Sequence, residues 1–417
     1  MIKNSWSRRE LLGSVAFAAL LPQGSKAALP LPADSGIRHI VVLTMENRSY
    51  DHFFGWIPKS DGRQAGLTYF DAENQPHATY HLEDLQGCGF QDPDHSYEGG
   101  RVEYNNSLCD GWLLVNDEFS IGYYTRDDFS FYGPAVNHWT VFDRYFSATM
   151  AGTFPNRVYA WAAQTDRSDN TFEISTLPTI FDSLLAAGRS TLYYFNDVPF
   201  TALWGPKYLG ISRPFEQFLS DAAAGSLPDV SFVDPRFLGE KEGLSGDDHP
   251  FSDIRNGQAF INQVYEALVR GPGWEGTLFV INYDEWGGFF DHVPPPMAAD
   301  ENPDFALRGF RTPAMMIAPW TKRSVKQGVS SRIYDSASIL KMIEWRWSLP
   351  ALTVRDAAAN NLVEDLDFSG KVRKNAPKYD VESGFFGTPC ATAAAPRLPG
   401  EWDVLRQLAA GYGFLLS

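Results

Sequence analysis

Short apolar runs alternate with amphipathic stretches along most of the chain. Two runs rich in β-branched residues, 37–44 (IRHIVVLT) and 277–283 (TLFVINY), are apolar on both faces, as are strands covered on both sides of a parallel sheet. Three shorter apolar runs, at 191–195, 230–233 and 314–318, have the length and composition of further strands. The pattern therefore predicts a sheet whose main strands are buried on both faces.

Helical patterns lie between these runs. The stretch 180–187 is followed by Gly188, a residue typical of a helix C-terminus. The stretch 256–270 has apolar residues at helical spacing and stops at a Gly-Pro pair, and a third helical stretch covers 338–347. Alternating strands and helices predict the α/β class: an α/β/α sandwich with a largely parallel central sheet.

Residues 56–135 do not follow this alternation. They are rich in Gly, Asp, Asn, Tyr and Pro and show no clear periodicity. We interpret them as a long, cap-like excursion over the end of the sheet where ligands bind, and we expect 28–417 to form a single domain. The chain after about Asp367 looks like irregular structure that follows the surface.

The first 27 residues have the features of a twin-arginine signal peptide. Arg8 and Arg9 precede an apolar run at 11–21, and small residues precede a cleavage site after Ala27. The run is too short for a permanent membrane anchor. The segment predicts a periplasmic or secreted protein, and the alternative is an uncleaved N-terminal helix.

The three cysteines leave their pairing open. Cys88 and Cys109 lie in one short, loop-like stretch, whereas Cys390 is far away in the sequence. An oxidising compartment permits a Cys88–Cys109 disulfide, and three unpaired thiols are the alternative.

Charge narrows the classes of partner. Lys and Arg number 35 against 51 Asp and Glu, which gives a formal net charge of −16 at pH 7. Such a chain is a poor binder of nucleic acid, and we expect at most transient contact with a membrane surface. If it handles phosphate groups it needs a local positive centre, for which a divalent metal ion is the simplest choice.

Polar residues follow the two longest predicted strands. Glu46 and Asn47 come after the first, and Asp284 and Glu285 come directly after the second. Ligands bind at the carboxyl ends of strands in open parallel sheets, so these side chains are expected at one edge. Three carboxylates buried together call for a cation, and the set predicts a divalent metal site. The alternative is that they are helix N-caps and surface acids.

A candidate nucleophile lies in the segment 151–157 (AGTFPNR). A helix is expected from about Arg157 to Ala163, which places Thr153 near its N-terminus, where backbone N–H groups bind phosphate. A hydroxyl there, bound to a metal ion, has a lowered pKa and is able to attack phosphorus. Taken alone, a threonine in this position is more often simply a helix N-cap.

Three of the eight histidines have suggestive neighbours. His249 follows Asp247-Asp248, which we expect to favour its charged form. His292 follows Asp291 before a proline-rich turn, and His95 lies in the aromatic excursion. Each is a candidate to protonate a leaving group, with His249 the first candidate, and the alternative for each is a capping or turn-stabilising histidine.

Several segments together resemble a known family. HIVVLTMENRSYDHFFG, GTFPNR, DDHP and YDEWGGFFDHVPPP, with the later ILKMIEWRWSLPALTVRDAAA, resemble the bacterial phosphoesterases that include non-haemolytic-type phospholipases C and acid phosphatases. The resemblance runs from about residue 37 to about residue 368. It implies an alkaline-phosphatase-like fold with a metal ion in the active site. It also implies roles for particular residues: Glu46, Asn47, Asp284 and Glu285 as metal ligands, Thr153 as the metal-bound nucleophile, and His95, His249 and His292 as further catalytic residues.

The leading functional hypothesis is metal-dependent cleavage of phosphodiester head groups, as in a phospholipase C. An acid phosphatase acting on phosphomonoesters is the alternative enzyme. A catalytically silent binding protein on the same fold is the third hypothesis, and it is disfavoured because every proposed ligand and the hydroxyl are present.

Overall fold

The computed structural model describes residues 29–322, 328–390 and 400–416. The predicted signal peptide, 1–27, lies outside the described residues. None of the helices in the described ranges has the length and apolar character needed to cross a membrane.

The centre of the molecule is one mixed sheet in which most strands are parallel. β1 lies between β9 and β10 and runs parallel to both, whereas β11 is antiparallel to both of its neighbours. In spatial order the described strands of this sheet are β12 (Val329–Ser330), β6 (Thr140–Phe142), β11 (Ala314–Ile317), β10 (Thr277–Tyr283), β1 (His39–Met45), β9 (Val230–Val233), β7 (Thr191–Phe195) and β8 (Ser212–Pro214).

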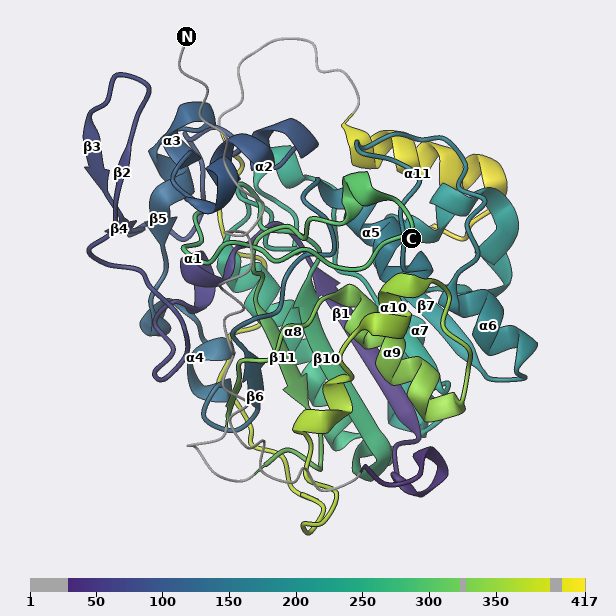
Figure 1. Cartoon of the computed structure of the whole chain (residues 1–417). Helices are drawn as coiled ribbons and strands as arrows, with labels where there is room; N and C mark the ends of the chain where they lie inside the picture. The colour runs from purple at the N-terminus through teal and green to yellow at the C-terminus, as the bar shows by residue number, and fades with distance from the viewer. Residues whose placement is uncertain (1–28, 323–327, 391–399, 417) are drawn as a thin grey trace, which may run out of the picture.

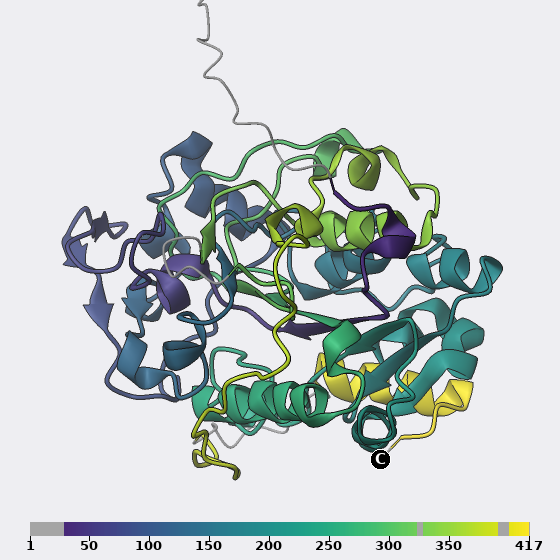
Figure 2. The same ribbon diagram turned by 90° about the horizontal axis from the view of Figure 1, so that it is seen from below.

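Helices cover both faces of the sheet. Their bounds are α1 (Tyr50–Phe54), α2 (Tyr97–Tyr104), α3 (Trp112–Val115), α4 (Tyr132–Ala135), α5 (Thr153–Ala162), α6 (Ile180–Ala186), α7 (Phe215–Ala224), α8 (Ile254–Arg270), α9 (Ser336–Trp347), α10 (Val354–Ala358) and α11 (Glu401–Tyr412). Seen from below, the sheet lies between layers of helices, with α9 on one side and α8 on the other (Figure 2).

Alternation along β1 explains this sandwich. Ile40 and Val42 point into one apolar core, which they share with residues of α5, α6 and α9. Val41 and Leu43 point into the other, which they share with residues of α7 and α8. Successive side chains of a strand face opposite sides of a sheet, so a strand that is apolar at every position requires a cover on both. The predicted α/β/α sandwich with a largely parallel sheet is confirmed.

Most of the predicted elements are present, with two corrections. The five predicted strands and the helices at 180–187, 256–270 and 338–347 all form, within two residues of their expected bounds. However, α5 begins at Thr153 rather than near Arg157, because Pro155 is accommodated within the first turn, where its missing N–H is not needed. The chain after Asp367 is not wholly irregular, because it includes α11.

The segment 56–135 folds into short elements over one end of the sheet. It contains a small hairpin of β2 (Thr68–Phe70) with β3 (Pro76–Ala78), and β4 (Tyr80–His81) pairs with β5 (Gly122–Tyr123). Trp112 of this segment packs in a buried aromatic cluster with Trp286, which follows β10. In Figure 1, β1 points toward the end of the molecule where α2 and α11 lie.

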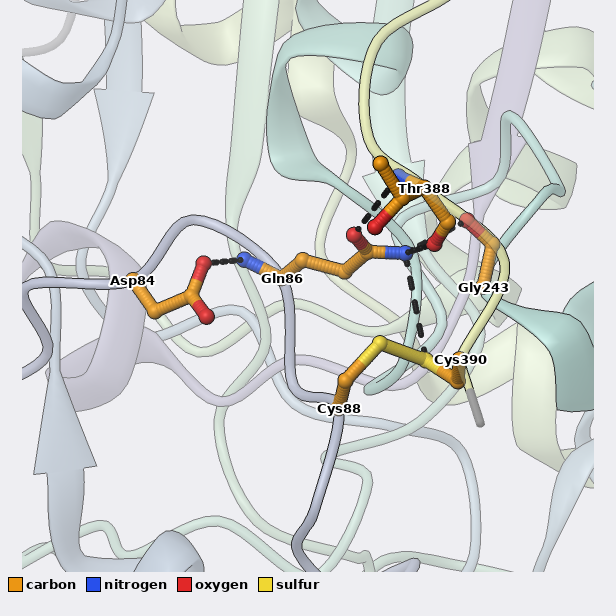
Figure 3. The surroundings of a disulfide bond; sticks show 6 residues. All are labelled: Asp84, Gln86, Cys88, Gly243, Thr388 and Cys390. Carbon is orange, nitrogen blue, oxygen red and sulfur yellow. Dashed lines mark hydrogen bonds between the residues drawn. A yellow bond between two sulfur atoms is a disulfide. The ribbon is translucent and has the colours of Figure 1, made fainter. Parts of the chain in front are cut away.

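The disulfide joins Cys88 to Cys390, so neither alternative left open by the sequence, a Cys88–Cys109 bridge or three unpaired thiols, is present. Cys109 is unpaired and buried beside Trp112 in the same aromatic cluster. Cys390 reaches Cys88 because the chain after 386 crosses back over the excursion. Gln86 fixes this crossing, since its side chain donates to the carbonyl of Thr388 (2.8 Å) and accepts from the Thr388 N–H (3.1 Å) (Figure 3).

Candidate active site

Three neighbouring strands deliver carboxylates to the same edge. Pairing of Met45 with Tyr283, the last residues of β1 and β10, sets Glu46-Asn47 beside Asp284-Glu285. On the other side of β1, β9 ends at Val233 and is followed by Asp234, which is also buried. Parallel strands share one carboxyl edge, so the expected meeting of distant acidic segments follows from the register.

Arg157 neutralises part of this charge. Its buried guanidinium group contacts Glu46 (3.0 Å), Asp234 (2.6 Å) and Asp284 (3.3 Å). Arg157 lies four residues after Thr153 on α5, so the two side chains share one face of the helix. One guanidinium group against three carboxylates leaves the edge negatively charged.

Asn47 connects the acidic edge to the candidate nucleophile. Its backbone N–H donates to Asp284 Oδ1 (3.3 Å), and its side-chain oxygen accepts from the Thr153 hydroxyl (3.3 Å). Asn47 has a φ of 59°, in the left-handed region that costs most side chains free energy. The backbone of Gly287 lies so close to Asn47 that a Cβ atom at 287 would overlap the Asn47 carbonyl. The glycines after Glu285 therefore let this strained turn pack against the second acidic segment.

A cavity of about 440 Å³ opens over this edge. Glu46, Asn47, Thr153, His95 and His249 line it, together with the loop 238–242 and the first turn of α11. Asp284 and Glu285 are not part of the lining formed by the described residues. The structure thus brings Thr153 and two of the three candidate histidines to one solvent-accessible space.

His95 is held with its ring toward Asn47. Its Nδ1 donates to the Pro93 carbonyl (2.7 Å), and the Asn47 amide lies 3.4 Å from Nε2. Burial favours the neutral ring, but the carboxylates of Glu285 and Asp92 and the hydrogen bond to Pro93 outweigh it and raise the pKa of His95 to about 9.

His249 is not charged in the way its sequence neighbours predict. Burial, reinforced by the positive charges of His95 and Arg48, lowers the pKa of His249 well below its ordinary value. Asp247 accepts from the His249 backbone N–H rather than facing the ring. The ring Nε2 instead lies 2.8 Å from Glu240, whose carboxyl pKa burial and Asp247 raise well above the usual range. The ring of His249 therefore pairs with Glu240 rather than with the two aspartates that precede it in the sequence.

His292 belongs to a different cluster, outside the cavity lining formed by the described residues. Its Nδ1 lies 2.5 Å from Asp51, and Arg311 contacts both Asp51 (3.1 Å) and Asp291 (2.9 Å). Because Arg311 already pairs with both carboxylates, this buried network fits a structural role, fastening α1 to the loop before β11.

The unpaired oxygens of the acidic edge fit a divalent cation. Glu46 Oε2, Glu285 Oε1 and Asp247 Oδ2 are buried and have no hydrogen-bond partner. Burial raises the pKa of Glu285 to about 8 and that of Asp247 to about 7. Oxygen atoms of Glu46, Glu240 and Asp247 also lie within 4.8 Å of one another. Hard carboxylate and amide oxygens with unused lone pairs are the donors that Mg²⁺ and Ca²⁺ take.

The sequence reasoning missed four residues of this site. Asp234 could have been predicted, because it directly follows a predicted strand. Arg157 could also have been predicted, because it lies one helical turn from Thr153. In the sequence, Asp247 is distinguished only as a neighbour of His249. Glu240 could not have been predicted, because it lies in a loop that only the tertiary fold brings to the acidic edge of the sheet.

Sequence similarity to known proteins defines the class to which this α/β chain belongs. The chain belongs to the Phosphoesterase family, which its residues 37–350 match. Membership in this family makes the protein a phosphoric-ester hydrolase.

Curated relatives support the same class. The chain is 31% identical to Non-specific phospholipase C6 of Arabidopsis thaliana, over 92% of this chain and 82% of that protein. It is 27% identical to Phospholipase C B of Mycobacterium tuberculosis, over 92% and 91% of the two chains. A solved protein in the alkaline phosphatase superfamily from Vibrio parahaemolyticus is similar over 81% of this chain and 79% of its own, at 10% identity and with a TM-score of 0.36.

Proposed function

We propose that the protein cleaves the phosphodiester bond of phospholipids in the manner of a phospholipase C, with Thr153 as its nucleophile. The observation that carries this proposal is the position of the Thr153 hydroxyl, which lines the cavity and bonds to Asn47 beside the acidic edge. The relatives named phospholipase C support the diester substrate.

Glu46, Asn47, Asp284 and Glu285, together with Thr153, would hold a divalent metal ion. When bound, such an ion supplies positive charge that stabilises phosphate oxygens and lowers the pKa of a neighbouring hydroxyl. The unpaired oxygens of Glu46 and Glu285 support this set of ligands.

The chain's own residues have separable roles in this proposal. Thr153 Oγ1 loses its proton to solvent and forms a bond to phosphorus as the bond from phosphorus to the departing alcohol breaks. Water later hydrolyses the threonyl ester, which restores the hydroxyl and releases the phosphorylated head group. The N-terminal turn of α5 adds partial positive charge beside the phosphate. His95 donates the proton that the departing oxygen needs, and Arg157 keeps Glu46 and Asp284 in place.

The test compares wild type with Thr153→Ala and Thr153→Ser on p-nitrophenyl phosphorylcholine and p-nitrophenyl phosphate. We expect the diester to be preferred, and the alanine variant to lose about a thousandfold or more in kcat. The serine variant keeps a hydroxyl and retains partial activity. Stability changes by only about 1 kcal/mol, because a single hydrogen bond is lost. An active alanine variant points to direct attack by water, and preference for the monoester points to a phosphatase.

We also propose that the protein is exported by the twin-arginine route and therefore lies outside the cytoplasm. The Cys88–Cys390 disulfide supports an oxidising compartment. Replacing Arg8 and Arg9 by lysine is expected to leave the precursor in the cytoplasm, and normal export of that variant contradicts the assignment.

A further inference from the structure

A buried acid of α2, Glu103, lies close to the site but outside the cavity. It is fully buried, and it is not among the described residues that line the cavity. Burial raises the pKa of Glu103 well above its usual range, so an acid at this position costs free energy of folding. The hydrogen bonds of Glu103 indicate what this acid does.

Both oxygens of Glu103 accept hydrogen bonds from side chains of other segments. The indole N–H of Trp286 donates to Oε2 (2.8 Å), and the side-chain amide of Asn116 donates to Oε1 (2.8 Å). Trp286 is itself fully buried and directly follows Glu285, a proposed metal ligand. Glu103 is therefore placed to hold these two side chains rather than to contact substrate.

The asparagine leads on to His95. The Asn116 side-chain oxygen accepts from the Asp94 N–H (2.5 Å), and Asp94 Oδ1 accepts from the Ser96 N–H (2.9 Å). These two residues flank His95, whose Nδ1 donates to the Pro93 carbonyl (2.7 Å). The main chain on both sides of His95 is thus fixed, and one of the residues that fix it is held by the buried acid of α2.

Two glycines of α2 allow this close packing. A Cβ atom at Gly99 would overlap the Asp94 carboxyl group, and a Cβ atom at Gly100 would overlap the Trp286 ring. The turn after Trp286 touches the same segment, since a Cβ atom at Gly288 would lie 2.8 Å from the Asp94 carbonyl oxygen. The helix therefore packs directly against both segments and fixes the distance between them.

We propose that Glu103 is a positioning residue that fixes the place of His95 relative to the turn after Glu285. This inference rests on the proposed function, because it takes His95 as the donor of a proton to the departing oxygen. The segment 56–135, which contains both Glu103 and His95, then supplies part of the catalytic geometry. A displacement of about 1 Å can cost a factor of roughly 100 in rate, so a contact outside the cavity is enough to matter.

The experiment breaks and then restores one hydrogen bond, in the full chain with its disulfide intact. Glu103→Gln leaves one oxygen for two N–H donors and turns an amide N–H₂ toward the other donor, so either Trp286 or Asn116 loses its acceptor. Adding Asn116→Asp exchanges donor and acceptor. The new amide then donates to the new carboxylate, whose second oxygen still accepts from the Asp94 N–H. The double variant has the same net charge as the wild type.

Two substrates report on the position of His95. The ratio of kcat for dihexanoyl phosphatidylcholine to kcat for p-nitrophenyl phosphorylcholine depends on proton donation, because p-nitrophenolate departs without a proton. We expect Glu103→Gln to lower this ratio about tenfold with little change in KM, and added Asn116→Asp to restore it. In a His95→Gln background, Glu103→Gln should lower the ratio no further, because both changes act on one proton transfer.

The matched control is Glu344→Gln, the same change at a buried acid of α9 that is not among the described residues lining the cavity. It should leave the ratio unchanged even if it lowers the Tm. Hydrogen–deuterium exchange is a readout independent of activity: the peptide with residues 94–96 should exchange faster in Glu103→Gln and at the wild-type rate in the double variant. If Glu103→Gln does not fold, Asn116→Ala replaces it, because it removes the same link from the His95 side.

Three outcomes overturn the proposal: a ratio that a folded Glu103→Gln leaves unchanged, a lowered ratio that Asn116→Asp does not restore, and an equal fall in Glu344→Gln. Failure of the wild type to cleave either substrate removes the proposed function instead, and a ratio unchanged in His95→Gln removes its role as proton donor. In both of those cases exchange at 94–96 still decides whether Glu103 holds that segment.

Discussion

Two histidines line the cavity, with ring centroids 6.4 Å apart, and differ in what occupies their nitrogens. His249 Nε2 pairs with Glu240 Oε1, which lies 2.8 Å away. His95 is fixed through Nδ1 to a backbone carbonyl, which leaves Nε2 beside the side-chain nitrogen of Asn47, the residue whose side-chain oxygen accepts from the Thr153 hydroxyl. Position therefore favours His95 over His249 as the residue that protonates the departing oxygen, the reverse of the order the sequence favours.

The first prediction compares His95→Gln with His249→Gln on two leaving groups. A lipid alkoxide needs a proton to depart, whereas p-nitrophenolate does not. We expect His95→Gln to slow lipid cleavage about a hundredfold while slowing the p-nitrophenyl ester far less. His249→Gln should affect both substrates alike. Equal losses on both substrates for His95→Gln would show that it positions phosphate rather than donating a proton.

The second prediction separates two overlapping sets of oxygen donors. Glu46 belongs both to the proposed set with Asn47, Asp284 and Glu285 and to the cluster with Glu240 and Asp247. If the proposed set holds the metal, Glu285→Gln loses bound metal and Glu240→Gln keeps it. The measurement is metal content of the purified proteins by mass spectrometry, with the Tm before and after chelation. Metal retained by Glu285→Gln but lost by Glu240→Gln would move the site to the other cluster.

At the scale of elements, the start of α9 depends on one buried carboxylate. Asp335 Oδ1 accepts from the Ala337 N–H (3.0 Å) and caps the helix, while Oδ2 accepts from Arg308 (2.6 Å) and Arg355 (3.0 Å). Burial alone would raise the pKa of Asp335, but the two guanidinium groups outweigh it and lower the pKa. The carboxylate therefore stabilises α9 only while it is ionised.

The third prediction is that Asp335→Asn costs about 3 kcal/mol or more near neutral pH, because it leaves Arg355 buried with less compensating charge. A lowered pKa gives stability that is present above the unfolded value of about 3.9 and lost as pH falls through the folded value. The difference between wild type and variant should therefore shrink below about pH 4. Urea denaturation at several pH values measures it, with Glu216→Gln as an exposed control. A constant difference across that range would contradict the ion-pair explanation.

The spacing of apolar residues was enough to predict the helices and strands that pack against the two apolar cores. The runs that became β1 and β10 are apolar at nearly every position, and α8 keeps helical spacing over its length, so the sandwich could be predicted. The strands β6, β8 and β12 were missed because each has only two or three residues and owes its conformation to a neighbouring strand. α5 begins four residues before the expected Arg157, because Pro155 fits within its first turn and the helix starts at Thr153.

At the scale of the whole molecule, the unpredicted features are those that join distant segments. The acidic edge was predictable because parallel strands share one carboxyl edge, whatever their separation in sequence. The pairing of Cys88 with Cys390 was not, because 302 residues separate them and only the folded path of the tail brings them together. Glu240 and α11 reach the cavity for the same reason, through contacts that no local pattern encodes.

The last prediction concerns this long-range bond. A cross-link that closes so long a loop stabilises the fold mainly by restricting the unfolded chain, and typical effects are about 2–5 kcal/mol. Replacing Cys88 and Cys390 together by serine should lower the Tm by about 2–6 °C for a chain of this size. It should also raise KM more than it lowers kcat, because Thr153 stays in place while the first turn of α11, which forms part of the cavity wall, is less firmly held. A reducing agent should lower the Tm of the wild type to that of the double serine variant, and it should leave the Tm of the variant unchanged. The control is Cys109→Ala, which removes the unpaired thiol and should have the Tm and KM of the wild type. If reduction changes neither the Tm nor KM, the bond does not hold the wall of the cavity.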